Sequence, residues 1–264
     1  MKNNLQIWAI GDIHGSYVPV ENFWRRNRGK QKFSPDKDVL VCLGDFGGNF
    51  YLNKTDNNFK EKLERYDLTY FAIRGNHEAR ASVCAANNPD QWHMEEFFGN
   101  KVYVEDNFPY IKYALDEPAL YQIKEYKTLV IPGAYSIDKN YRLEKGWPWF
   151  EDEQLSPEEM DTGRRIVEEN KQVELVLSHT CPIIYEPRDL FLPFIKQSTV
   201  DKTMEMYLGE IEFKLNYKLW LWGHYHAYRT YFNNHGRKCI MLCHQNAINI
   251  NETVYSASKV IKTY

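Results

Sequence analysis

Short runs of apolar residues recur along the chain, and a polar turn containing Gly, Asp, Asn or His follows each of them. The five clearest runs are at residues 5–10, 39–43, 68–73, 173–177 and 219–222. Runs of four to six apolar residues with little alternation are typical of β-strands that are buried on both faces. The pattern therefore predicts five buried strands.

Helical segments are predicted between these strands, at residues 18–28, 57–66, 157–170 and 199–216. The third has the best start signal, because Ser156 is a suitable N-cap, Pro157 suits the first helical position and Glu159 completes a capping box. Strands that alternate with helices in this way predict an α/β fold with a largely parallel sheet near the N-terminus.

The C-terminal third shows a different pattern. Residues 228–232 and 238–242 flank a polar segment at 233–237, which predicts a β-hairpin, and residues 252–261 are expected to form a further strand. We therefore expect a second, more antiparallel sheet. Since the sequence shows no repeat, low-complexity segment or linker, we expect one domain over residues 1–264.

Composition narrows the class of protein. Apolar residues make up 43% of the 264 positions and charged residues 26%, as in soluble globular proteins. A net charge of −3 disfavours an extended surface for nucleic acid. Five scattered cysteines fit reduced thiols, and the sequence has neither a membrane-spanning apolar stretch nor a signal-peptide core. We therefore expect a cytoplasmic protein that does not bind membranes.

The candidate chemistry lies where the predicted strands end. Five strand ends carry seven candidate metal ligands, which are Asp12 and His14, then Asp45, then Asn76, then His179, and finally His224 and His226; His77 follows Asn76 directly. In open α/β sheets, ligands bind beyond the carboxyl ends of the strands. Carboxylate, amide oxygen and imidazole suit Mn, Fe or Zn at a hydrolytic centre. Seven ligands are too many for one ion and suit two ions that share a bridging carboxylate.

These motifs together resemble the calcineurin-like metallophosphoesterase superfamily. They are, in order, Gly11-Asp12-Ile13-His14-Gly15, Gly44-Asp45, Gly75-Asn76-His77-Glu78, Ser178-His179 and Gly223-His224-Tyr225-His226. The resemblance extends from residue 11 to residue 226. It implies a two-sheet β-sandwich flanked by helices, and a dinuclear metal centre that hydrolyses phosphate esters.

The resemblance also implies a role for each motif residue. Asp12, His14 and His226 would hold the first metal, Asn76, His179 and His224 the second, and Asp45 would bridge the two ions. His77 would be the general acid that protonates the leaving oxygen, and a metal-bridging water would be the nucleophile. We expect two divalent ions, with Mn first and Fe, Zn or Ni as alternatives.

Departures from the family pattern bear on the substrate. Arg74 precedes the Gly75-Asn76 turn, as in protein Ser/Thr phosphatases and dinucleoside-polyphosphate hydrolases, where such an arginine binds phosphate. The resemblance therefore implies that Arg74 binds the phosphate of the substrate. Those branches also place an acid that orients the catalytic histidine, and a second arginine, where this chain has Gly48 and Asn49. The two branches, and a non-catalytic scaffold of the same fold, are therefore the alternatives to a phosphoesterase that acts on a small or medium ester. Such an ester could be a nucleotide. The sequence does not distinguish a phosphomonoesterase from a phosphodiesterase, and it does not indicate the oligomeric state.

Two aromatic stretches leave predicted strand ends on the metal side. The first holds Tyr135, Tyr141, Trp147, Trp149 and Phe150, and the second follows His179 with Tyr185, Phe191 and Phe194. Ordinary packing is the preferred interpretation in a chain so rich in aromatic residues, and walls of a substrate pocket are the alternative.

Overall fold

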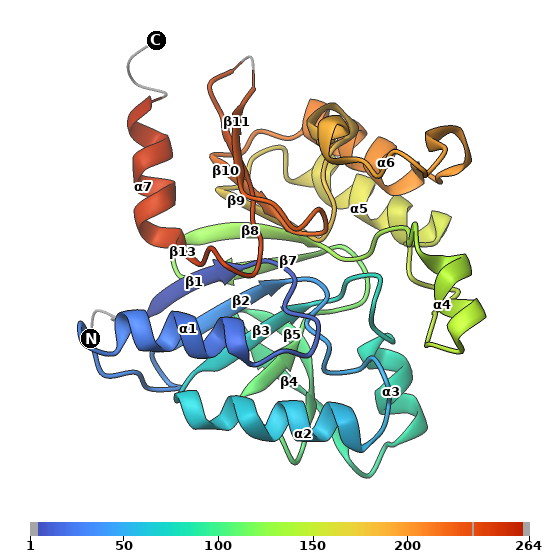
Figure 1. Ribbon diagram of the computed structural model, residues 1–264. Coiled ribbons are helices and arrows are strands. Elements are labelled where there is room, and N and C mark those ends of the chain that lie inside the picture. Colours follow the sequence, from blue (N-terminus) through green and yellow to red (C-terminus); the bar gives the residue numbers. More distant parts are fainter. Residues whose placement is uncertain (1–4, 234, 261–264) are drawn as a thin grey trace.

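The computed structural model describes residues 5–233 and 235–260. Two mixed β-sheets lie face to face, and helices cover the outer side of each sheet (Figure 1). This arrangement confirms the α/β fold with two stacked sheets and outer helices.

The first sheet contains the N-terminal strands. In spatial order its strands are β13 (Ile248–Asn249), β1 (Gln6–Ile10), β2 (Asp38–Leu43), β3 (Thr69–Ile73), β6 (Ile111–Tyr113), β5 (Asn100–Glu105) and β4 (Trp92–Phe97). Strands β1, β2, β3 and β6 run parallel, while β13, β5 and β4 pair antiparallel at the two sides. The first three predicted strands are confirmed to within one residue at each end.

The second sheet corrects one expectation. Its strands are β11 (Arg229–Phe232), β12 (Lys238–Met241), β10 (Leu219–Trp222), β9 (Leu175–Ser178), β8 (Tyr126–Ile131) and β7 (Ala119–Ile123). The predicted hairpin is confirmed as the antiparallel β11–β12 pair, although residue 234 of its turn lies outside the described residues. The four central strands, however, run parallel, so the sheet is mixed rather than mainly antiparallel.

Alternate residues of the central strands face two different cores. In β1, Ile7 and Ala9 lie between the two sheets, whereas Trp8 and Ile10 face the helices outside. Burial on both faces explains why these strands show little alternation in the sequence. A fully buried Leu or Ile contributes about 1.5–3 kcal/mol, so this four-layer packing is the main source of stability.

The helices are α1 (Val18–Asn27), α2 (Lys54–Leu63), α3 (Ala81–Asn87), α4 (Lys139–Lys145), α5 (Pro157–Glu169), α6 (Thr203–Lys214) and α7 (Ile250–Val260). Short 3₁₀ turns are η1 (Glu64–Tyr66), η2 (Ile183–Tyr185), η3 (Arg188–Leu190) and η4 (Gln197–Thr199). Helices α1 and α2 pack on the first sheet, and α5 and α6 pack on the second (Figure 1). The expected Ser156–Glu159 capping box is present.

The prediction of a strand at residues 252–261 is wrong. Residues 252–260 belong to helix α7, and residue 261 lies outside the described residues. Ile250, Val254 and Ala257 are buried. Their spacing of four and then three residues is helical, which places all three on one face of α7. Among the described residues, no helix has both the length and the apolar character to cross a membrane.

Candidate active site

The polar residues after five strands meet at one edge of the two sheets. Strands β1, β2 and β3 are parallel neighbours, as are β9 and β10, so the loops that leave them lie side by side. Hydrogen bonds join the two groups of loops. His179 Nδ1 lies 2.8 Å from the Leu43 carbonyl oxygen, and the backbone N–H of His224 donates to both Asp12 carboxylate oxygens, each at 2.9 Å. The carboxyl ends of both sheets therefore form one site.

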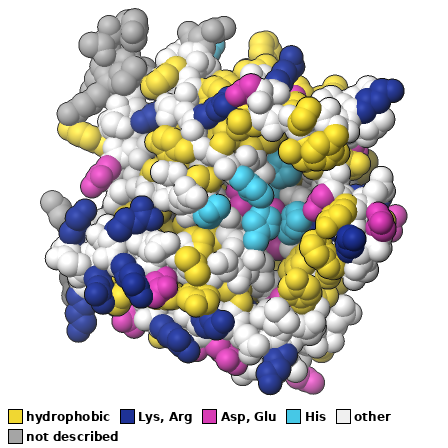
Figure 2. Space-filling model, in the orientation of Figure 1, with side chains coloured by type: hydrophobic (Ala, Val, Ile, Leu, Met, Phe, Trp, Pro, Cys, Tyr) yellow, Lys and Arg dark blue, Asp and Glu magenta, His cyan; other side chains and the backbone are white. Residues whose placement is uncertain are grey.

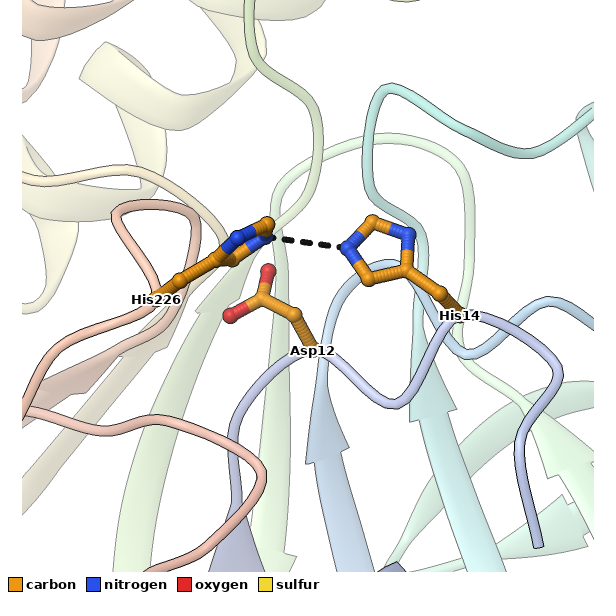
Figure 3. Close-up of side chains that lie close together, drawn as sticks. All are labelled: Asp12, His14 and His226. Carbon is orange, nitrogen blue, oxygen red and sulfur yellow. Dashed lines mark hydrogen bonds between the residues drawn. The ribbon is translucent and has the colours of Figure 1, made fainter.

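Asp12, His14 and His226 form the first cluster of ligand atoms (Figure 3). These atoms all lie within 4.8 Å of one another. The two imidazole rings point toward each other near the Asp12 carboxylate, with their Nε2 atoms 3.0 Å apart. One carboxylate and two imidazole nitrogens are a donor set that suits Mn, Fe or Zn.

A second cluster lies beside the first and shares Asp12 with it. The ligand atoms of Asp12, Asp45 and His179 also lie within 4.8 Å of one another. Asn76 Oδ1 is 2.8 Å from His179 Nε2, and the His224 ring centroid is 4.9 Å from that of His179. Asp45 lies between the clusters, because one of its oxygens is 3.8 Å from His14 Nε2 and the other 3.5 Å from His179 Nε2. All seven expected ligands are thus brought together.

The surrounding hydrogen bonds fix how two of these donors point. The Leu43 carbonyl can only accept, so His179 carries a proton on Nδ1. The Ser136 hydroxyl donates to Glu153 and can then only accept from Asn76 Nδ2, at 2.8 Å, which turns Asn76 Oδ1 toward His179 Nε2. When His179 is neutral, two lone pairs therefore face each other across 2.8 Å, an arrangement that a cation between them would stabilise.

Several candidate ligands have a left-handed backbone. The φ angles are +46° at His14, +47° at Asp45, +68° at His224 and +53° at His226. For residues other than glycine this conformation costs about 1–2 kcal/mol, although Asp and His adopt it more readily than most. Close packing also demands glycine at residue 44, because a Cβ there would stand 1.9 Å from His179 Nδ1. Such clustering of strained residues is typical of functional sites.

The electrostatics of the site also favour a cation. Burial raises the pKa of Asp12 to about 7, with the charge of Asp45 adding to the effect and that of His179 opposing it. Burial would lower the pKa of His179, but the charges of Asp45 and Asp12 outweigh it and raise that pKa to about 9. Burial and the neighbouring His14 lower the pKa of His226 to about 4, which leaves His226 neutral at pH 7. The raised pKa values of Asp12 and His179 mean that this buried cluster attracts positive charge, which a metal ion that displaces these protons would supply.

His224 provides a further test of the fit. The residue is half-buried, but its Nδ1 atom is buried and has no hydrogen-bond partner among the described residues. Burial, and then the charge of His179, hold the pKa of His224 well below its usual value, so the ring is neutral and one of its two nitrogens offers a lone pair. A buried ring nitrogen without a partner is rare in proteins, and a cation held at this site would give it one.

A comparison with models of known protein families assigns this chain to one of them. A profile of the family described as calcineurin-like phosphoesterase matches residues 5–228. The chain belongs to the calcineurin-like phosphoesterase family. This membership supports metal-dependent hydrolysis of phosphate esters, and the family implies a centre of two divalent metal ions.

Solved structures that are similar to this phosphoesterase have low sequence identity to it. The protein TT1561 of Thermus thermophilus is 12% identical over 94% of this chain and 96% of that chain, with a TM-score of 0.53. The dimetal phosphatase LOC 393393 from Danio rerio is 10% identical over 92% and 88%, with a TM-score of 0.49. Phosphopantetheinyl hydrolase from Mycobacterium tuberculosis is 14% identical over 93% and 92%, with a TM-score of 0.47. No curated protein sequence matches the chain. The likeness to TT1561 shows the fold alone.

The expected general acid, His77, lies beside the first cluster of this phosphoesterase. Its ring centroid is 5.0 Å from that of His14, and its backbone N–H donates to Asp45 at 2.9 Å. The carboxylate that faces it belongs to Asp138, whose Oδ2 is 3.7 Å from His77 Nε2. An acid at residue 48 would not fit, because a Cβ at Gly48 would stand 2.5 Å from the Tyr113 hydroxyl. The carboxylate beside His77 therefore comes from a different segment than the sequence pattern led us to expect.

Arg74 is the one expected site residue that the structure does not bring to the centre. Its side chain is buried, and it donates to the backbone carbonyl of Glu153 at 2.7 Å. Its Nε atom lies 3.4 Å from an Asp116 carboxylate oxygen. The guanidinium therefore ties the β3 turn to two other segments, and Arg74 is not among the residues that line the cleft.

Two clefts open from the candidate centre and meet at His14 and His77. The larger, about 370 Å³, extends past Tyr135 and Tyr225 to helix α6 and the segment before it. The smaller, about 230 Å³, is bordered by Phe50, Tyr51 and Trp147. Figure 2 shows the histidines gathered in a hollow of this face, with apolar side chains on both sides. Part of each aromatic stretch therefore lines a pocket, while Tyr141 and Trp147 also pack on each other.

The sequence motifs do not include a second group of residues, which contact Asn76 and His77 or one another through hydrogen bonds and ion pairs. Ser136, Asp138, Arg142 and Glu153 all follow strand β8. Arg142 is fully buried, donates to Ser136 and lies 3.2 Å from an Asp138 oxygen. One signal was available, because the apolar end of Tyr126–Ile131 is followed by Pro132 and Gly133, the same strand-and-turn pattern that marks the five predicted strands.

Proposed function

We propose that this chain hydrolyses small phosphate esters at a centre of two divalent cations, with His77 as the general acid and Asp138 as the residue that positions it. The observation that carries the proposal is the meeting of seven metal-binding side chains from five strand ends, within hydrogen-bond or van der Waals reach of one another, at the junction of two clefts.

The donors divide into two sets. Asp12, His14 and His226 would hold one cation, Asn76, His179 and His224 the other, and Asp45 would contact both. When bound, the two cations supply Lewis-acid stabilisation of the phosphate oxygens and lower the pKa of bound water. Mn is our first expectation for the metal, with Fe, Zn and Ni as alternatives.

His77 has the position and the environment of a proton donor. Its side chain is 23% exposed at the mouth of both clefts, so it can reach an ester oxygen there. Burial lowers the pKa of His77, while the negative charges of Asp45 and Asp138 raise it again in part. A histidine beside two carboxylates that favour its protonated form can give a proton to a leaving alcohol.

The shape of the site bears on the size of the substrate. A cleft of about 370 Å³ accommodates a small organic group and not a folded protein. Because two clefts meet at His14 and His77, a phosphorus atom there has room for substituents on both sides. Phosphomonoesters and phosphodiesters are therefore both candidates.

The test uses protein that is stripped of metal and reloaded with Mn, Fe, Zn, Ni or Mg. We expect turnover of 4-nitrophenyl phosphate, bis(4-nitrophenyl) phosphate or both with at least one metal, and loss of it in Asp12→Asn. Absence of turnover with every metal, in protein that binds the metal, would refute the proposed function and favour a non-catalytic scaffold.

A further inference from the structure

Glu205 on helix α6 is a buried carboxylate in the wall of the larger cleft. Glu205 is only 3% exposed to solvent. One oxygen, Oε1, accepts a hydrogen bond from the Thr180 hydroxyl at 2.7 Å. The other, Oε2, is buried and has no hydrogen-bond partner among the residues that the structure describes. A buried carboxylate oxygen without a donor is unfavourable on its own, so it points to a donor that a ligand supplies.

The position of Glu205 connects it to the catalytic centre. Thr180 follows the candidate ligand His179 directly, and Tyr225 lies between His224 and His226 in the sequence. The Tyr225 hydroxyl is 3.4 Å from Thr180 Oγ1. A molecule with its phosphate at the two clusters can therefore extend along the same cleft to Glu205.

The charges of this arm of the cleft favour a cation. Apart from the candidate metal ligands and His77, its charged lining residues are Asp138, Asp201, Glu205 and Lys202, of which only the last is basic. Lys202 is already neutralised, since its Nζ atom lies 2.6 Å from Glu186 and 3.2 Å from the Gln197 side-chain oxygen. A second phosphate or a carboxylate on the substrate would find no unpaired cation among the described lining residues.

The rest of the wall is apolar and aromatic. Phe191 stacks on Tyr225 with ring centroids 6.3 Å apart, and Leu190, Leu192 and Val200 lie on the same side of the cleft. The Lys202 ammonium lies 4.6 Å from the centroid of the Phe191 ring, so this ring already faces one cation. Apolar walls suit methylene groups, and an aromatic face beside a carboxylate suits an ammonium group.

From these contacts we infer that the larger cleft selects phosphate esters whose alcohol carries a primary ammonium group, and that Glu205 binds this group. The inference rests on the proposed function for the place of the phosphate. The ammonium donates to Glu205 Oε2 and so satisfies the buried oxygen, while the carbon chain between nitrogen and phosphate contacts the apolar wall.

The experiment measures binding and needs no turnover. Metal-loaded protein is titrated by calorimetry with ω-aminoalkyl phosphonates of two to six carbons and with the alkyl phosphonates of the same lengths. At the length that reaches Glu205, we expect the amino compound to bind about 10- to 100-fold more tightly, as a charged hydrogen bond in a buried site does. Equal affinities at every length, or no binding of either series, would overturn the inference.

Two variants assign the effect to Glu205. Glu205→Gln keeps the size of the side chain and an acceptor for Thr180, and we expect it to bring the affinity ratio close to one. Asp201→Asn is the matched control, because Asp201 lies in the same cleft but its oxygens already accept from Gln154 and from the Thr203 backbone N–H. It should keep most of the preference. The same ratio in Glu205→Gln as in the native chain, or an equal loss in Asp201→Asn, would contradict the assignment.

The outcome is separable from that of the proposed function. Hydrolysis of the corresponding phosphate esters is measured on the same metal-loaded protein. Turnover without a preference for the amino compounds refutes only the ammonium site, whereas selective phosphonate binding without turnover refutes only the hydrolytic function. If Glu205→Gln does not fold, the two phosphonate series on the native chain still decide the question.

Discussion

Replacing Asp138 by Asn tests whether this residue acts through His77. The Asp138 and His77 side-chain atoms are 3.7 Å apart, which corresponds to an attraction of about 1 kcal/mol in bulk water and about 4 kcal/mol at an effective dielectric constant of 20. The Asp138 side chain is 38% exposed and that of His77 23%, so solvent screening places the interaction at the lower end. We take about 1–2 kcal/mol, which is a factor of about 5–30 in rate.

The effect should depend on the leaving group. Removing the negative charge of Asp138 makes a proton on His77 less favourable, so Asp138→Asn should slow the hydrolysis of an alkyl phosphate by about 5- to 30-fold. A 4-nitrophenyl ester needs almost no protonation of its leaving group and should slow far less. The assay is kcat on both esters with the same metal, for the native chain and for Asp138→Asn.

A double-mutant cycle decides whether His77 mediates the effect. In a His77→Ala background, which should itself lose most activity on the alkyl ester, Asp138→Asn should have no further effect. Asp152→Asn is the control, since this acid is 48% exposed, contacts Arg80 and does not line either cleft. Equal slowing of both esters, or a full effect of Asp138→Asn without His77, would show that Asp138 acts by another route.

Two other predictions concern the metals and Arg74. Reloaded native protein should contain two divalent ions per chain by elemental analysis, and Asn76→Ala should lower this number and slow both esters together; one ion in the native chain would refute the dinuclear centre. Arg74→Met should lower the free energy of unfolding by about 1–3 kcal/mol in chemical denaturation, because carbonyls such as that of Glu153 lose a buried donor. It should leave KM within about twofold, and a large rise in KM at unchanged stability would restore the phosphate contact that the sequence suggested.

The central strands were predictable from the sequence because both of their faces are buried. The runs that became β1, β2 and β3 are apolar at nearly every position, and a short run of this kind followed by a turn is typical of a strand buried on both faces. Helix α7 was not predictable in the same way. Polar residues separate the three apolar positions of its buried face, and two of these, Ile250 and Val254, pack in the core between the sheets.

Arg74 shows the limit of reasoning from a motif. Its place in the chain, directly before Gly75 and Asn76, matches that of a phosphate-binding arginine. The direction of the side chain, however, depends on Asp116 and Glu153, which are 42 and 79 residues away in the sequence. A long side chain follows its strongest hydrogen-bond partners, and no local pattern records where these lie.

The same reasoning separates the candidate donors from the residues that would select the substrate. The donors stand at the ends of parallel strands, so the register of the sheets brings Asp12, Asp45 and Asn76 together whatever the loops contain. Glu205 reaches the cleft for a different reason. Helix α6 packs on the second sheet through Met204 and Leu208, which lie on either side of Glu205 in the sequence. This packing turns Glu205 toward Thr180. A carboxylate placed by helix docking has no fixed spacing from the donors, so proteins that share the strand-end motifs can differ at this position and in the alcohol they accept.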